Sequence, residues 1–481
     1  MVFPQTFRDW RVATGAVSLL ATLVAVVVIP PGWIPILLAV VATYGLAASP
    51  RLGWLGAGLL VLVAIPYGRG ADVAPLQVAG LPVRPQDGVI AAALFGALGS
   101  GGLRLRSANP FIIVIGAWLL IGVVALAVGL INGFQLRDVL RDARWWGLYA
   151  TGAIAIVCAT RRDQVVRGLL YGATVLATLV VLATVLPAFE GGLKAAVLSY
   201  DRGTLRMQFG NSVILVVATA FVALHALRRP SIRRLGWLAL LLVAQVLSLT
   251  RISLISTGVV VALVAIAYVW ERRSSGQLAH AARPLAAVGV TAIVAFAGGI
   301  GLNTLGVLTA SPDVTGGGEN PLDRITFSDE QSDISSIVNS VGSGGRLATY
   351  VNTLVEIQKS PVVGRGMGAL IEVPFAYNLD RAYTVGKQPG VDNAYLTAAL
   401  KGGLIAAAAL VTVFLVPLLA ALHNPTLRAW YVPAWVGLLA LTMTQSFAVS
   451  SYGPFALALL ASLPFLGYAA RRAEAARSHA N

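Results

Sequence analysis

The chain has 481 residues, of which 57% are hydrophobic and only 11% are charged, and its mean hydropathy is +0.80. This composition excludes a soluble protein, because long apolar runs with few charges can be satisfied only in lipid, where helices close their own backbone hydrogen bonds. The single cysteine, Cys158, excludes a disulfide framework and a cysteine-based metal site within one chain.

Fourteen apolar runs can be read along the chain as membrane helices. Several are shorter than the usual 20 or so residues, so 12 spans with re-entrant pieces would also fit, and we expect an all-α polytopic membrane protein with 12–14 transmembrane helices. The first run follows two arginines and has no small-residue cleavage site after it, which indicates a retained helix rather than a signal peptide. The runs are 13–29, 33–48, 52–66, 87–101, 110–131, 144–160, 164–187, 211–227, 235–249, 252–270, 284–302, 393–422, 429–447 and 453–469.

The basic residues gather on one side of this arrangement. With the N-terminus inside, the inner segments hold 19 Lys or Arg and four acidic residues, whereas the remaining segments hold 16 of each. The whole excess of +15 therefore lies on one side, as the positive-inside rule requires. The charge indicates a topology with both termini in the cytoplasm, and not a nucleic-acid-binding protein.

These spans divide the chain into four parts. We expect N-terminal transmembrane helices over 1–302, a large extracytoplasmic loop over 303–391, C-terminal transmembrane helices over 392–470 and a basic cytoplasmic tail over 471–481. Within the loop, apolar residues recur at helical spacing from Arg346 onward, which predicts an amphipathic helix that ends before Pro361.

The outer segment 132–144 also has a helical pattern, with Arg137, Arg141 and Arg144 on one face. Two interpretations stay open for these arginines. Asp138 and Asp142 can simply neutralise them, or the arginines can contact an anionic headgroup or a diphosphate.

No cofactor or metal site is predicted. The GRGMG sequence at 364–368 lacks the third glycine and the strand–helix–strand unit of a dinucleotide site, so it predicts a tight turn with Arg365 at the surface. The outer segments hold neither a D-x-D pair nor a histidine cluster, which favours metal-independent chemistry.

The outer side does offer arginines around one carboxylate: Arg206, Arg251, Arg346, Arg365 and Asp392. Guanidinium groups bind phosphate bidentately and can stabilise a leaving diphosphate, while a nearby carboxylate can accept a proton from a sugar hydroxyl. Two alternatives stay open. Arg251 can snorkel to the headgroups, and Asp392 can serve only as the cap of the helix that starts at Asn393.

Four segments, in order, resemble the bacterial O-antigen ligase and O-antigen polymerase superfamily. Residues 346–368 read RLATYVNTLVEIQKSPVVGRGMG, residues 392–405 read DNAYLTAALKGGLI, residues 202–211 read RGTLRMQFGN, and residues 250–253 read TRIS. The ordered set, rather than any single motif, carries the resemblance. At Asp392 the chain departs from the ligases, which usually have a histidine there, so the role of that histidine does not carry over.

The resemblance implies a glycosyltransferase in the bacterial cytoplasmic membrane. Such proteins transfer a glycan from a polyprenyl diphosphate to a hydroxyl of a glycan or glycolipid acceptor, and the resemblance leaves polymerase and ligase both open. It places Arg346 and Arg251 on the diphosphate, whereas the expectation that Asp392 orients or deprotonates the acceptor rests on the chemistry of its carboxylate and not on the resemblance. Substrate contacts are expected from Arg206, Asn211, Arg365, Asn393 and Tyr395.

A flippase for lipid-linked glycans is the alternative from another class. A transporter is expected to place ionisable groups inside its spans, and the predicted spans are nearly free of them. A scaffold protein without activity is the third interpretation, and it predicts tolerance to changes at the arginines.

Overall fold

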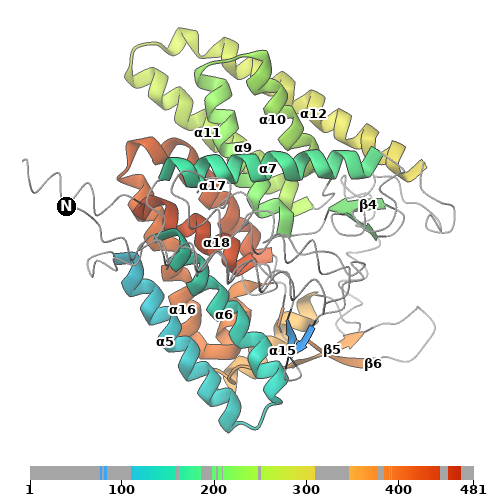
Figure 1. The fold of residues 1–481 in the computed structure, drawn as a ribbon, viewed down its shortest axis with the longest axis vertical. Helices are drawn as coiled ribbons and strands as arrows, with labels where there is room; N and C mark the ends of the chain where they lie inside the picture. The colour runs from blue at the N-terminus through green and yellow to red at the C-terminus, as the bar shows by residue number, and fades with distance from the viewer. Residues whose placement is uncertain are drawn as a thin grey trace, which may run out of the picture.

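The computed structural model describes residues 76–78, 81–83, 110–157, 162–185, 198–201, 204–207, 210–247, 251–308, 346–375, 384–388, 390–391, 393–444 and 453–466. These residues form long helices and three short hairpins (Figure 1). The helices before the outer loop are α5 (Pro110–Ile131), α6 (Leu136–Val157), α7 (Arg162–Val185), α9 (Gly210–Arg228), α10 (Ile232–Val246), α11 (Arg251–Ser274), η3 (Leu278–His280) and α12 (Ala282–Leu308). The later helices are α15 (Arg346–Gln358), α16 (Ala394–Leu422), α17 (Pro425–Thr444), α18 (Gly453–Ser462) and η7 (Leu463–Phe465).

Most of the described membrane helices lie close to the predicted apolar runs, but α6 begins at Leu136, before the predicted run 144–160, so most of that run and most of the predicted outer segment 132–144 form one continuous helix. In the described part of the chain, five are long and apolar enough to cross a membrane: Phe111–Ile131, Val165–Leu182, Ser253–Ser274, Leu278–Leu305 and Ala394–Leu422. The chain is therefore an all-α polytopic membrane protein, as its composition predicted. The first four predicted runs lie outside the described residues, so the total of 12–14 spans stays a prediction, as does the division into four parts.

Three two-stranded antiparallel hairpins occupy segments predicted as outer connections. β1 (Leu76–Val78) pairs with β2 (Leu81–Val83), β3 (Leu198–Asp201) with β4 (Thr204–Met207), and β5 (Ile371–Phe375) with β6 (Thr384–Gln388). These hairpins could not be predicted from the sequence, because each strand is only three to five residues long and too short to show a period.

Helix α9 is the centre of one part of the bundle. Its residues from Val213 to Leu227 are buried except for Phe221 and His225, and it packs against α7, α10, α11, α12, α17 and α18. A helix that is apolar on every side is buried on every side, which accounts for this position.

Aromatic side chains fix α5 against α6. The rings of Trp118 and Trp146 stack with centroids 4.6 Å apart, and the Trp146 indole N–H donates to the Trp118 carbonyl at 2.8 Å. Trp145 lies beside both rings. This packing sets the rotation of α6 and therefore the direction of its polar side chains.

Helix α16 is broken near its start, and a turn from the outer loop fills the break. Gly402 and Gly403 have non-helical backbones, and Gly403 has φ 70° and ψ −172°. The carbonyl groups of Leu400 and Lys401 instead accept hydrogen bonds from Arg365 N at 2.8 Å and Gly366 N at 3.0 Å. In return, Leu404 N donates to the Pro361 carbonyl at 2.8 Å. We call residues 361–369 the docking turn.

The docking turn also contacts α5. Met367 N donates to the Ala125 carbonyl at 2.9 Å, and the Asn132 side-chain amide donates to the Arg365 carbonyl at 2.8 Å. A Cβ on Gly366, whose φ is 91°, would lie 2.3 Å from Gly129 N, so the two backbones approach too closely for any other residue. The turn is thus held between α5 and the break in α16.

Gly403→Ala should destabilise the protein. The backbone at Gly403 is one that only glycine adopts easily, which costs about 1–3 kcal/mol for other residues, and the new Cβ would lie 1.9 Å from the Val362 carbonyl oxygen. We expect a lower midpoint of thermal unfolding in detergent. Gly116→Ala in α5, where a Cβ meets nothing within 4 Å, is the matched control. An unchanged midpoint for Gly403→Ala would contradict the docked geometry.

Candidate functional site

Most of the predicted site residues lie at the beginnings of helices. Arg251 is the first residue of α11, Arg346 is the first residue of α15, and Asn211 is the second residue of α9. Arg206 lies in β4, opposite Ser199 of β3. For these four residues the structure describes the backbone only, and Asp392 lies outside the described residues.

Several of these helix starts share one end of the bundle. A Cβ built on Gly437, in the later part of α17, would lie 3.5 Å from Val216 of α9 and 3.5 Å from the Ser256 carbonyl of α11. The second turns of α9 and α11 therefore lie against the later half of α17, so α9 and α11 begin toward the end of the bundle at which α17 ends. The start of α16 is at the same end, because the Asn393 side chain donates to the Met443 carbonyl at 3.1 Å.

The outer segment packs onto the start of α16. Ile357 of α15, Ile371 of β5 and Leu400 of α16 belong to one small buried cluster with Ala369, Val391 and Ala399. Helix α15, which begins at Arg346, is thereby joined to the helix that begins after Asn393.

Asn393, and not Asp392, caps α16. The Asn393 side-chain oxygen accepts from Tyr395 N and Leu396 N, both at 3.0 Å, and its amide nitrogen is engaged by Met443. The interpretation that gave the cap to Asp392 is wrong, because the helix begins one residue later than expected, at Ala394.

Tyr395 also ties α16 to α17. Its hydroxyl lies 3.1 Å from the hydroxyl of Thr442, and its ring packs edge-on against Phe414. These contacts give Asn393 and Tyr395 a structural part at the site, since they hold the beginning of α16 in place.

Arg365 lies on the docking turn with its side chain 36% exposed, as the sequence predicted. Glycines at 364, 366 and 368 have φ of 73°, 91° and 87°, which confirms the predicted tight turn. The Arg365 Nε lies 3.4 Å from a carboxylate oxygen of Glu356 in α15, so the side chain is directed toward that helix.

A buried ion pair lies directly beneath the docking turn. Lys401 of α16 is 0% exposed and its Nζ lies 2.6 Å from Oδ2 of Asp142 in α6, which is 5% exposed. The same carboxylate oxygen accepts from Gly368 N at 2.7 Å, and Lys401 Nζ also donates to the Ala369 carbonyl. Sequence reasoning missed this pair. The available signal was a lone lysine inside an apolar run, which is a functional hypothesis by default.

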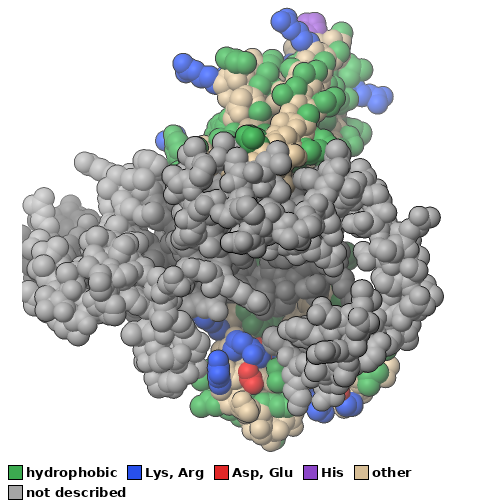
Figure 2. Space-filling view, turned by 90° about the vertical axis from the view of Figure 1, so that its right-hand side faces the viewer, with side chains coloured by type: hydrophobic (Ala, Val, Ile, Leu, Met, Phe, Trp, Pro, Cys, Tyr) green, Lys and Arg blue, Asp and Glu red, His purple; other side chains and the backbone are tan. Residues whose placement is uncertain are grey.

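The charged face of α6 is only partly neutralised within itself. Arg141 Nη1 pairs with Asp138 at 2.8 Å, whereas its Nε lies 3.5 Å from Asp142. The interpretation that both acidic residues neutralise the arginines of α6 thus holds for Asp138. Asp142 lies closer to Lys401 than to Arg141. Figure 2 shows side chains of both signs gathered at the lower end of the molecule, which is the end of the α5–α6 turn in Figure 1.

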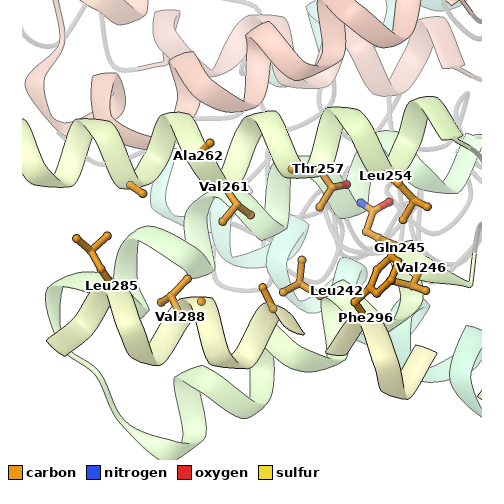
Figure 3. A pocket seen from close by; sticks show the side chains of 14 residues that line it. Leu242, Gln245, Val246, Leu254, Thr257, Val261, Ala262, Leu285, Val288 and Phe296 are labelled. Atoms are coloured by element: carbon orange, nitrogen blue, oxygen red, sulfur yellow. The ribbon is translucent and has the colours of Figure 1, made fainter. Parts of the chain in front are cut away.

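An apolar cavity of about 390 Å³ lies between α10, α11 and α12 (Figure 3). Its walls include Val261, Leu285, Val288 and Phe296, and its polar lining consists of Gln245 and Thr257. Because Leu254 and Gln245 also line it, one end of the cavity reaches the level at which α10 ends and α11 begins with Arg251.

Asn393→Ala should lower stability by about 1 kcal/mol, because two backbone N–H groups at the start of α16 lose their acceptor. Asn393→Asp keeps an acceptor oxygen at that position and should lower the stability by less. The measurement is the midpoint of thermal unfolding in detergent for the two variants. If Asn393→Ala were as stable as the unaltered protein but inactive, Asn393 would be a substrate contact rather than a cap.

The comparisons with known proteins bear on the same end of the bundle. The family model of the O-antigen ligases matches residues 235–411, which run from within α10 into α16 and include Arg251, Arg346, Arg365 and Lys401. No curated protein matches the chain. This matched region contains the two longest motifs on which the resemblance rested. Residues 235–411 of this membrane protein are thus similar to the O-antigen ligase family, which supports the resemblance to the O-antigen ligase and polymerase superfamily.

Proposed function

We propose that the protein is a glycosyltransferase of the bacterial cytoplasmic membrane that acts on the extracytoplasmic face. It transfers a glycan from a polyprenyl diphosphate to a hydroxyl of a glycan or glycolipid acceptor, without a metal ion. One observation carries the proposal: within the region similar to the O-antigen ligase family, the helices that begin at Arg251 and after Asn393 start at the same end of the bundle.

The diphosphate is held by arginines at helix starts. The first turn of a helix has unpaired N–H groups and a partial positive charge, both of which favour an anion. Arg251 and Arg346 stand at the first residues of α11 and α15 and add guanidinium groups that bind phosphate oxygens bidentately. Arg206 in β4 and Asn211 in the first turn of α9 are proposed as further substrate contacts, and so is Arg365, whose side chain is directed toward Glu356 of α15.

Transfer is a single displacement. An oxygen of the acceptor hydroxyl attacks the anomeric carbon, the bond from that carbon to the diphosphate oxygen breaks, and the configuration at the carbon inverts. The hydroxyl proton passes to the carboxylate of Asp392, and the polyprenyl diphosphate leaves with the electron pair. The arginines stabilise the charge that develops on the leaving diphosphate.

The lipid chain of the donor lies in the apolar cavity between α10, α11 and α12. The cavity is lined almost wholly by apolar side chains, and one end reaches the level of Arg251, so a chain lying there leads directly to the diphosphate site. Gln245, near the end of α10, lines the cavity beside Leu254 (Figure 3), at the end where the proposal places the polar headgroup.

Arg346→Ala should reduce transfer by about 10²–10³-fold, the usual effect of removing one group that stabilises transition-state charge. Asp392→Asn should reduce it by about 10²–10⁴-fold through loss of the general base. The measurement is transfer from a labelled polyprenyl-diphosphate oligosaccharide by purified protein, with a chelator present throughout. Lys359→Ala, which removes an exposed lysine near the same turn, is the control and should retain the rate.

The products of this assay also identify the kind of enzyme. A ladder of lengths indicates a polymerase, and one step onto a single acceptor indicates a ligase. Full activity of Arg346→Ala would exclude the proposed mechanism. Movement of the labelled lipid across a vesicle membrane, with no transfer, would instead identify a flippase.

Gly289→Leu should raise the KM for the donor at least several-fold and leave the KM for the acceptor unchanged. Gly289 lines the cavity, and a Cβ there meets nothing within 4 Å, so the new side chain enters the space of the lipid chain. Gly298→Leu is the matched control, because Gly298 lies on the same helix, is equally open and does not line the cavity. Equal KM values for the two variants would argue against a lipid chain in this cavity.

A further inference from the structure

We propose that Lys401 and Asp142 are a positioning pair for glycan transfer. Through the docking turn, the pair holds the segment that carries Arg346 and Asp392 against the helix starts. The proposal rests on the proposed function for its consequence in transfer, but its structural part is independent of which glycan is moved.

Lys401 and Asp142 are so deeply buried that their charged groups need hydrogen-bond partners in addition to each other. Lys401 is 0% exposed, Asp142 is 5% exposed, and their charged atoms are 2.6 Å apart. Charges removed from water are compensated only when close geometry is joined by hydrogen bonds to the remaining donors and acceptors. Arg141, 3.5 Å from Asp142, contributes from the surface side.

The remaining hydrogen bonds of the pair go to the docking turn. Oδ2 of Asp142 accepts from Gly368 N at 2.7 Å, and Nζ of Lys401 donates to the Ala369 carbonyl. Asp142 and Lys401 therefore bond each other, and each also bonds one backbone group of the turn. The two backbone groups belong to the consecutive residues Gly368 and Ala369. Loss of the turn would leave two buried charges incompletely paired, so the pair favours the docked turn over any undocked arrangement.

The docking turn joins two segments that carry the proposed catalytic residues, and we call the segment before the turn the first limb and the segment after it the second limb. Before it lies α15, which begins at Arg346, and after it lie β5 and β6, followed by Val391 and Asn393. Ile357 on the first limb and Ile371 on the second pack in one cluster with Leu400 of α16. A shift of the turn thus moves both limbs relative to α16.

A purely structural role would be to join α6 to α16. The contacts argue for more, because within the described part of the chain the hydrogen bonds that the two ions make beyond each other go to the loop backbone and not to a third helix. The other hydrogen bonds of the turn link uncharged backbone groups or the amide of Asn132, and the ion pair of Arg365 with Glu356 joins the turn to α15 rather than to a membrane helix. Among the described residues, the Lys401–Asp142 pair is therefore the charged contact that fixes the turn to the membrane helices, and transfer should follow its integrity.

The experiment compares Lys401→Met with the double variant Lys401→Met/Asp142→Asn. The reporter is Ala369→Cys, a buried position, in a background where the single cysteine has been changed by Cys158→Ser. Three quantities are measured for each protein: the rate of labelling by a water-soluble maleimide, the rate of transfer, and the thermal midpoint. Lys359→Met, which breaks an exposed pair with Glu356 in the same segment, is the control.

Lys401→Met should label at least 10-fold faster than the unaltered background and transfer at least 10-fold more slowly, mainly through kcat. The double variant should regain thermal stability, because it buries no unpaired charge. It should nevertheless keep fast labelling and slow transfer, since the Ala369 carbonyl still lacks its donor. Lys359→Met should change none of the three quantities.

Slow labelling of Lys401→Met would overturn the proposal, because the turn would then stay docked without the pair. Recovery of transfer together with stability in the double variant would also overturn it and leave a structural role only. Absence of transfer by the unaltered protein would refute the proposed function and the role in transfer, while labelling would still decide whether the pair holds the turn.

Discussion

The fold depends on how the break in α16 is satisfied. A helix inside a membrane cannot leave carbonyl and N–H groups unpaired, since each unpaired group costs several kcal/mol in lipid. The glycines at 402 and 403 interrupt the helix and release such groups, and the docking turn supplies Arg365 N, Gly366 N and the Pro361 carbonyl in their place. The break and the turn therefore require each other. Together they bring α15 and β5 to a fixed position on the bundle.

This mutual dependence gathers segments that are far apart in the sequence. Helix α5 contributes the Ala125 carbonyl and the close approach at Gly129, α6 contributes Asp142, and α16 contributes Lys401. The aromatic packing of Trp118 on Trp146 fixes the rotation of α6 so that Asp142 is directed inward. A rigid frame of this kind is what a site on a loop needs, because catalytic groups must be held within a fraction of an ångström of their working geometry.

The sequence predicted what is periodic and missed what depends on contacts between distant segments. The run 110–131 became α5 with the same bounds, and the helix from Arg346 ended before Pro361, because apolar spacing and proline are local signals. The break in α16 was not predicted, since two glycines among alanines and leucines look like a helix interior. The partner of Lys401 could not be predicted either, because nothing local links it to Asp142. The starts of the site helices were predicted within a residue or two, whereas the side-chain assignments of Asp392, Arg346 and Arg251 stay predictions.

The cap of α16 bears directly on the proposed chemistry. Had Asp392 been the cap, its carboxylate would have been engaged by backbone N–H groups, which stabilise the charged form and make it a poor base. Asn393 performs that role with one end of its amide and holds α17 with the other. On the other side, Val391 exchanges hydrogen bonds with the Thr397 hydroxyl, so the residues on both sides of Asp392 are fixed to α16 without its help. The cap of α16 is therefore supplied by Asn393. The proposed mechanism assigns the proton of the acceptor hydroxyl to Asp392, the residue immediately before that cap.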